Sequence, residues 1–116
     1  MAKALMVVGS NPTGPDAEAA YNEWYTEQHL DDVLRVAGFA AARRYSHSEV
    51  RPMADTEPSP FGYLALYEVE SDDLAATAEK LQAALDSGAI PISEHFDLSA
   101  FSVDFYELIQ ESERTA

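Results

Sequence analysis

Residues 22–39 read NEWYTEQHLDDVLRVAGF, and this stretch decides how the chain is expected to fold. Aromatic and apolar side chains recur at i, i+4 spacing until Gly38, which is typical of an amphipathic helix that ends at a glycine. Phe39 then opens a strand. Because the helix should lie against a sheet, some of its polar groups must be buried and need partners. The helix is therefore the expected location of any reactive site.

The flanking segments predict the element order strand, helix, strand, strand, helix, strand. Strands are expected at residues 3–9, 39–48, 61–70 and 99–109. Helices are expected from an Asp16 cap to about Val36, and from a Ser71 cap to Gly88. This is the α+β, ferredoxin-like βαββαβ plan: a four-stranded antiparallel sheet with two helices on one face. Residues 1–116 then form a single domain with a polar tail from about residue 110.

The composition excludes several classes of function. The chain has 21 acidic and 7 basic residues and a net charge of −14, so it repels nucleic acids and anionic membrane surfaces. It has no cysteine, which excludes disulfides, thiolate nucleophiles and cysteine-bound metals. The N-terminal apolar run lacks a signal-peptide pattern, and no segment is long enough to span a membrane. We therefore expect a cytoplasmic protein.

Alternation along the strands predicts a homodimer. In the second strand it assigns Phe39, Ala41, Arg43, Tyr45 and His47 to one face, with Arg44 on the other. The other strands also carry aromatic or aliphatic side chains on both faces. Because the helices cover only one face of the sheet, the other face is an apolar association surface. Pairing of two sheets face to face would bury it.

The pattern Asn22-x-Trp24-Tyr25-x-x-x-His29, followed by Gly38-Phe39 and Arg44-Tyr45, resembles the EthD-like branch of the dimeric α/β-barrel superfamily. This resemblance implies ferredoxin-like subunits that pair through their sheets into a barrel. It also implies a ligand cavity between each sheet and its own helices. The superfamily includes polyketide cyclases, cofactor-free monooxygenases, muconolactone isomerases and haem-degrading enzymes, so the fold carries over better than the activity.

One departure from the family pattern concerns the residues after His29. EthD-like sequences often have a proline shortly after this histidine, whereas this chain has Leu30-Asp31-Asp32. We therefore expect the helix to continue past His29 rather than break there.

Helical spacing aligns Tyr21, Tyr25 and His29 on one stripe. In the functional interpretation, His29 is a general acid/base and Tyr25 donates a hydrogen bond to a substrate oxygen. Asn22 or Asp32 would then orient the imidazole. The alternative is a core histidine bonded to a backbone carbonyl, with the tyrosines serving as packing.

Several other residues are candidates for ligand binding. Arg44 and the adjacent Arg43 can hold a carboxylate or enolate through their forked donors, although one arginine here can also bridge to a carboxylate of the helix or of the partner subunit. Aromatic side chains can line a cavity suited to a flat, aromatic or polyketide-like ligand. These side chains are Tyr21, Trp24, Tyr25, Tyr63 and Tyr67.

No cofactor or metal is expected. His29, His47 and His95 lack a paired metal-binding spacing, and the chain has neither a phosphate-binding loop nor a haem-binding signature. The sequence thus predicts a cofactor-independent cyclase, isomerase, dehydratase or related lyase that acts on a small hydrophobic oxygenated compound. A non-catalytic binding or accessory module, and a haem-linked or cofactor-free monooxygenase, are the alternatives.

Overall fold

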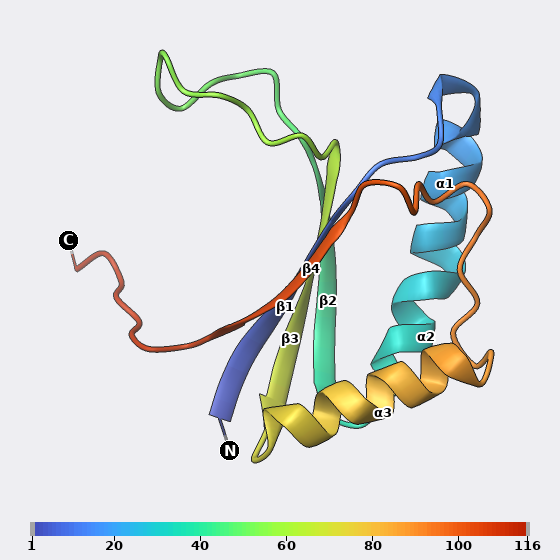
Figure 1. Cartoon of the computed structure of the whole chain (residues 1–116). Helices are drawn as coiled ribbons and strands as arrows, with labels where there is room; N and C mark the ends of the chain where they lie inside the picture. Colours follow the sequence, from blue (N-terminus) through green and yellow to red (C-terminus); the bar gives the residue numbers. More distant parts are fainter. Residues whose placement is uncertain (1, 116) are drawn as a thin grey trace.

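The computed structural model describes residues 2–115. Along the chain lie β1 (Ala2–Ser10), a 3₁₀ turn (Pro15–Ala17), α1 (Glu18–Trp24), a π turn (Tyr25–His29), α2 (Leu30–Leu34), β2 (Phe39–Ser46), β3 (Tyr63–Ser71), α3 (Leu74–Asp86) and β4 (Ser102–Glu107). The backbone remains helical from α1 through the π turn into α2, which makes them one continuous helix (Figure 1). No helix among these residues is long and apolar enough to cross a bilayer.

Within residues 2–115 the strands form a four-stranded antiparallel sheet in the order β2-β3-β1-β4. β1 lies between β3 and β4, and its register with β3 runs from Ala2 opposite Ser71 to Ser10 opposite Tyr63. The helices lie on the same side of the sheet (Figure 1). This arrangement confirms the predicted α+β, ferredoxin-like fold.

The core lies between the sheet and the helices. Alternate residues of β1 and β3 point toward the helices and are buried there, in keeping with the period of two in a strand. Tyrosines contribute much of the buried volume, so the interior carries hydroxyl groups as well as apolar surface. The buried apolar and aromatic residues are Ala4, Met6, Val8, Tyr21, Tyr25, Val33, Phe39, Ala65, Tyr67, Val69, Ile90 and Phe96.

β2 contains an irregularity that overturns one predicted face. Its pairing with β3 shifts between Phe39 and Ala41, as in a β-bulge. Phe39 is therefore buried on the helix side, the side that Arg44 also faces. The prediction that Phe39 shares a face with Arg43 was wrong, because one extra residue reverses the alternation that precedes it.

Two predicted helix caps were also wrong. Asp16 lies inside the 3₁₀ turn rather than before the helix. The cap of α3 is Asp73, whose carboxylate accepts the backbone N–H three residues further on at 3.1 Å. Ser71 lies two residues earlier and bonds the backbone N–H of Asp73 and the hydroxyl of Thr77. Asx and Ser side chains bond nearby backbone groups equally well, which makes the exact cap hard to predict.

Gly38 ends the helix, as predicted, and its position requires a glycine. Its φ is +104°, a conformation that side chains rarely adopt. A Cβ there would lie 3.0 Å from Cγ2 of Thr77 in α3. The absence of a side chain thus allows the chain to turn from α2 into β2 directly against α3.

The sheet face opposite the helices carries exposed apolar side chains. Leu64 is 37% exposed, Tyr45 49% and Tyr106 60%. The loop between β2 and β3 and the C-terminal tail both extend on this side (Figure 1). These extensions give a radius of gyration of 15.6 Å, whereas a compact chain of this length has about 13 Å.

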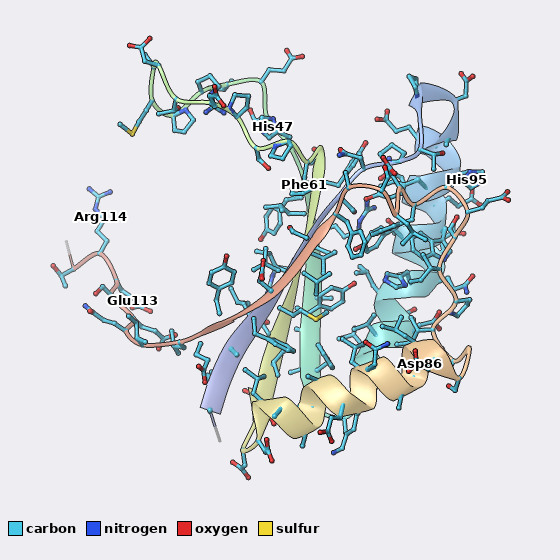
Figure 2. All side chains as sticks on the ribbon, in the orientation of Figure 1. His47, Phe61, Asp86, His95, Glu113 and Arg114 are labelled. Atoms are coloured by element: carbon cyan, nitrogen blue, oxygen red, sulfur yellow. The ribbon has the colours of Figure 1, made fainter. Side chains whose placement is uncertain are left out.

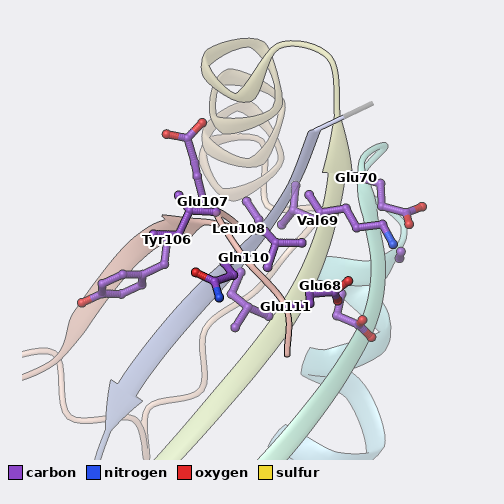
Figure 3. Close-up of a pocket in the computed structure, with 13 residues that line it drawn as sticks. Glu68, Val69, Glu70, Tyr106, Glu107, Leu108, Gln110 and Glu111 are labelled. Carbon is purple, nitrogen blue, oxygen red and sulfur yellow. The ribbon is translucent and has the colours of Figure 1, made fainter. Parts of the chain in front are cut away.

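A groove of about 610 Å³ runs beside the C-terminal tail (Figure 3). Residues of β1, β3 and β4 form one wall, and tail residues from Leu108 to Glu111 form the other. Tyr106 and Leu108 supply apolar surface, while Glu68 and Glu70 supply charge. The groove is therefore part of the exposed sheet face and lies outside the helix–sheet core.

Candidate functional site

The π turn from Tyr25 to His29 lies at the centre of the helix that the sequence singled out. The backbone N–H of Leu30 bonds the carbonyl of Tyr25, five residues earlier, instead of the usual four. The helix thus continues past His29, as the absent proline predicts, but it accommodates one extra residue there. Single π turns often occur at functional sites because they change where side chains project.

His29 packs against aromatic rings inside the helix–sheet layer. Its ring stacks on Trp24 with centroids 4.5 Å apart and an angle of 26°, and it meets the edge of Tyr25 at 5.0 Å. Tyr21 lies one turn away and meets Tyr25 at 5.5 Å. Relative exposures are 0% for Tyr21, 1% for Tyr25 and 7% for His29. The predicted stripe is therefore buried along its whole length.

Arg44 of β2 enters the same layer from the sheet. Its guanidinium donates to the side-chain oxygen of Asn22 at 2.9 Å and to the hydroxyl of Thr26 at 3.1 Å. The guanidinium carbon lies 4.3 Å from the ring centroid of Tyr25, with Tyr21 and Tyr63 at 5.6 and 5.4 Å. Such distances are typical of cation–π contacts. Arg44 thus connects β2 to the helix through neutral groups.

The two neighbouring arginines have different environments. Arg43 is exposed on the other face of the sheet and bonds the carboxylate of Glu68 at 2.9 Å. Among residues 2–115, Arg44 forms no ion pair within 4.0 Å. Arg43 thus bridges to a carboxylate, but that carboxylate lies on β3 and not on the helix, as one form of the prediction had it.

Asn22, Tyr63 and Asp32 have partners other than His29. The amide nitrogen of Asn22 donates to the hydroxyl of Tyr63 at 3.1 Å, while its oxygen accepts from Arg44. The carboxylate of Asp32 is nearly buried and accepts from Arg35 at 2.6 Å. Asp32 still favours a protonated His29 through its charge. Neither Asn22 nor Asp32 is hydrogen-bonded to the imidazole, so the proposal that one of them orients His29 remains a prediction.

Four buried polar atoms within residues 2–115 have no hydrogen-bond partner there, and they belong to one cluster. They are Tyr25 Oη, His29 Nδ1, Arg44 Nε and Tyr67 Oη. Arg44 and His29 both contact the Tyr25 ring. The hydroxyls of Tyr25 and Tyr67 lie near enough for a weak interaction with each other, although no hydrogen bond of 3.5 Å or less joins them. Because buried polar atoms are nearly always bonded, unpartnered atoms in one place indicate a position for a polar ligand. We call these four residues the buried polar cluster.

Tyr67 was predicted only as a cavity-lining ring, not as a site residue. Alternation in β3 assigns it to the same face as Tyr63, so that much was readable from the sequence. Its proximity to Tyr25 depends on how the helix packs on the sheet, which alternation does not determine.

Burial changes the ionisation of the buried polar cluster. Loss of solvation lowers the pKa of His29 to about 4, with Asp32 opposing this effect and Arg44 adding to it. Burial likewise raises the pKa of Tyr25 to about 12 and raises the pKa of Tyr67. At neutral pH the site therefore contains a neutral imidazole, two protonated phenols and a guanidinium cation.

The other histidines lie away from this cluster. His47 is at the base of the loop between β2 and β3, whereas His95 is on the far side of the helix (Figure 2). In the described part of the chain, no three His, Cys, Asp or Glu side chains come close enough to hold a metal ion.

Neither of two prominent surface hollows is lined by a residue of the buried polar cluster. The groove of about 610 Å³ belongs to the exposed sheet face, and a second hollow of about 340 Å³ lies outside α1 beside Trp24 and Glu27. His29 and Tyr25 are closely packed in this conformation. A ligand would therefore need the helix to move relative to the sheet before it could enter.

No protein-family model matches the sequence, and no curated protein matches it. Solved structures do match. An ethyl tert-butyl ether D (EthD) family protein from Bacillus halodurans C-125 is 14% identical, with a TM-score of 0.59 over 94% of this chain and 100% of that one. A dimeric ferredoxin-like protein of unknown function from Jannaschia sp. CCS1 is 15% identical, with a TM-score of 0.53 over 91% and 99%.

A protein from Shewanella loihica PV-4, provisionally named a monooxygenase, is 17% identical, with a TM-score of 0.56 over 96% of this chain and 99% of that one. The chain has the ferredoxin-like fold that these proteins share. The fold resemblance read from residues 22–45 is thereby confirmed. At these identities the likeness concerns the fold alone, and the activity has to be argued from the site.

The unpartnered hydroxyls predict an unusual response to Tyr→Phe substitutions. Tyr25→Phe and Tyr67→Phe should each leave the free energy of unfolding within about 0.5 kcal/mol or raise it, because each removes a buried hydroxyl without a partner. Tyr21→Phe is the control, since its hydroxyl bonds Ser10 Oγ at 2.6 Å. It should lose about 1–2 kcal/mol in urea denaturation. An equal loss from Tyr67→Phe would mean that its hydroxyl is bonded in the free protein.

The low pKa of His29 predicts a loss of stability in mild acid. The unfolded chain takes up a proton near pH 6.5, whereas folded His29 does so only near 4, so stability falls as the pH drops between these values. From pH 7 to pH 5 the wild type should lose about 2 kcal/mol more than His29→Gln. NMR titration of the His29 ring protons checks the pKa directly, and a midpoint near 6.5 would contradict the burial argument.

Proposed function

We propose that the protein binds a small hydrophobic oxygenated molecule between the helix and the sheet and transfers a proton on it without a cofactor. The observation that supports this most strongly is the buried polar cluster, whose four unpartnered atoms belong to side chains packed around Tyr25. An imidazole, two phenols and a guanidinium are the groups needed to move a proton and to stabilise the resulting charge.

In this proposal each residue has a defined role. Neutral His29 is the base that removes a proton from the carbon next to a carbonyl, and the electron pair moves onto the carbonyl oxygen. Tyr25 donates a hydrogen bond to that oxygen, and Arg44 stabilises its negative charge. Asp32 favours the imidazolium that forms, because its charge already raises the pKa of His29. Return of the proton at another atom completes an isomerisation, and related steps lead to cyclisation, dehydration or decarboxylation.

Aromatic side chains would select the shape of the substrate. Tyr21, Trp24 and Tyr63 present flat rings near the polar groups. Asn22 is hydrogen-bonded to both Tyr63 and Arg44 and so fixes their positions relative to each other. Flat walls with a few convergent polar groups suit an aromatic or polyketide-like compound.

A second candidate is a non-catalytic binding module, which the close packing of the site favours. Tyr25 and His29 are 1% and 7% exposed, so substrate entry and product release would both require movement. A binding module that holds its ligand for long periods does not need rapid opening.

We also propose that the protein is a homodimer. Exposed apolar residues on the open sheet face, together with a loop and a tail that extend past it (Figure 1), support pairing with a second copy. The Jannaschia protein of similar fold is named as dimeric. A symmetric pair would bury Leu64, Leu66 and Tyr106 of both subunits.

Proton transfer can be tested with acetophenone, a flat aromatic ketone, in D₂O. The wild type should speed exchange of its methyl protons at least about tenfold over free imidazole at equal concentration. His29→Gln should abolish the acceleration, whereas His95→Gln, whose ring is 36% exposed beside Glu94, should keep it. Because His29 is neutral above about pH 5, the rate should be flat from pH 5 to 8.

The same experiment separates the two candidate functions. If acetophenone shifts the indole N–H signal of Trp24 but exchange is not accelerated, the protein binds without catalysis. If it does neither, both candidates fail for this class of compound. The chain contains one tryptophan, so the NMR signal is unambiguous.

The dimer is tested by a charge on the open sheet face. Leu66→Glu should convert the dimer to a monomer in light scattering, because two copies of the carboxylate would be buried at the interface. Ala83→Glu, on the exposed side of α3, adds the same charge and should leave the dimer unchanged. A wild-type protein that is monomeric at high concentration would refute the proposal.

A further inference from the structure

Arg44 carries a positive charge that the described residues do not balance. Its contacts are an amide, a hydroxyl and three tyrosine rings, and it forms no ion pair among residues 2–115. Two other arginines do have carboxylate partners. Arg35, just after α2, bonds Asp32, and Arg43, on the open sheet face, bonds Glu68. In a chain of net charge −14, a partly buried arginine without a carboxylate is unexpected.

The unpartnered atoms around Arg44 are mainly hydrogen-bond donors. Arg44 Nε donates only, and the hydroxyls of Tyr25 and Tyr67 remain protonated at neutral pH because burial raises the pKa of both. Nδ1 of neutral His29 can donate or accept, depending on its tautomer. These donors and the adjacent guanidinium suit an oxygen with negative charge.

We propose that the ligand of this site is an anion, whose carboxylate or enolate oxygen is held by Arg44, Tyr25 and Tyr67. This inference rests on the proposed function, because it names the class of molecule that occupies the buried polar cluster. It also gives Tyr67, which the sequence predicted only as a cavity-lining ring, a hydrogen-bonding role toward the ligand.

The charges argue against the other classes of ligand. A cation would be repelled by Arg44 and would find few acceptors. A neutral ketone would satisfy the donors but would leave the partly buried guanidinium without a counter-charge, which stabilises it less than a carboxylate would. An anion satisfies both requirements. The acidic surface repels anions elsewhere, so this site would be selective for them.

The test compares benzoate with benzamide, which have nearly the same shape but differ in charge. Each is titrated into the intact wild-type protein, and the indole N–H signal of Trp24 reports binding beside His29. Benzoate should bind at least about tenfold more tightly than benzamide, as expected for hydrogen bonds to a charged group. This comparison needs no variant and therefore does not depend on whether a variant folds.

Variants then identify the residues responsible. Tyr67→Phe should weaken benzoate binding by about threefold, and Arg44→Gln should weaken it by at least about tenfold. Neither variant should change the binding of benzamide. Arg44→Lys, which keeps the charge but loses Nε, should give an intermediate affinity. Arg51→Gln is the control, because it removes the same charge from an exposed loop where Arg51 bonds only Thr56. It should bind benzoate as the wild type does.

Each outcome decides the proposal. Equal binding of benzoate and benzamide would refute the proposal that the ligand is an anion, while leaving a small-molecule site in place. If neither compound binds, the anion proposal is refuted as well, and ordered water is then the expected partner of the unpartnered atoms. If Arg51→Gln weakens benzoate as much as Arg44→Gln, the effect comes from net charge and the assignment to Arg44 is wrong. Failure of the acetophenone exchange alone would refute proton transfer on neutral aromatic ketones but not anion binding.

Discussion

The contact between Arg44 and the helix is the interaction on which the arrangement of the site depends. The guanidinium bonds Asn22 and Thr26 and lies over the ring of Tyr25, so it holds one face of the helix against β2. A charged group in this position needs compensation, which the surrounding tyrosine rings supply only in part. The same requirement explains why hydroxyls and an imidazole, rather than aliphatic side chains, occupy this part of the core.

The π turn and the burial of His29 act together. The extra residue in the turn allows the imidazole to stack on Trp24 while it also meets the edge of Tyr25. Removal from water then lowers the pKa of His29 to about 4, because the charged imidazole loses more solvation than its neighbours restore. The result is a histidine that is neutral at physiological pH and available as a base. Its weakness as a base would be offset by any negative charge that develops beside it, since such a charge raises its pKa.

Much of the architecture was predictable because it depends on local patterns. Alternation identified the strands, helical spacing identified the stripe of Tyr21, Tyr25 and His29, and Gly38 marked the end of the helix. The predictions failed where a single residue changes the count: the bulge after Phe39 and the cap at Asp73 rather than Ser71. Propensity does not distinguish these positions, because packing between the elements decides them.

The sequence by itself determined the order of elements, the ferredoxin-like fold and the helix that carries His29, because these follow from side-chain periodicity and from glycine. Only the tertiary structure decided which polar groups meet. It brought Tyr67 of β3 and Arg44 of β2 to Tyr25 of the helix, across distances in sequence that no local pattern spans. It also paired Asn22 with Arg44. The physical reason is that hydrogen bonding and desolvation depend on positions in space, and those are fixed when the helix packs on the sheet.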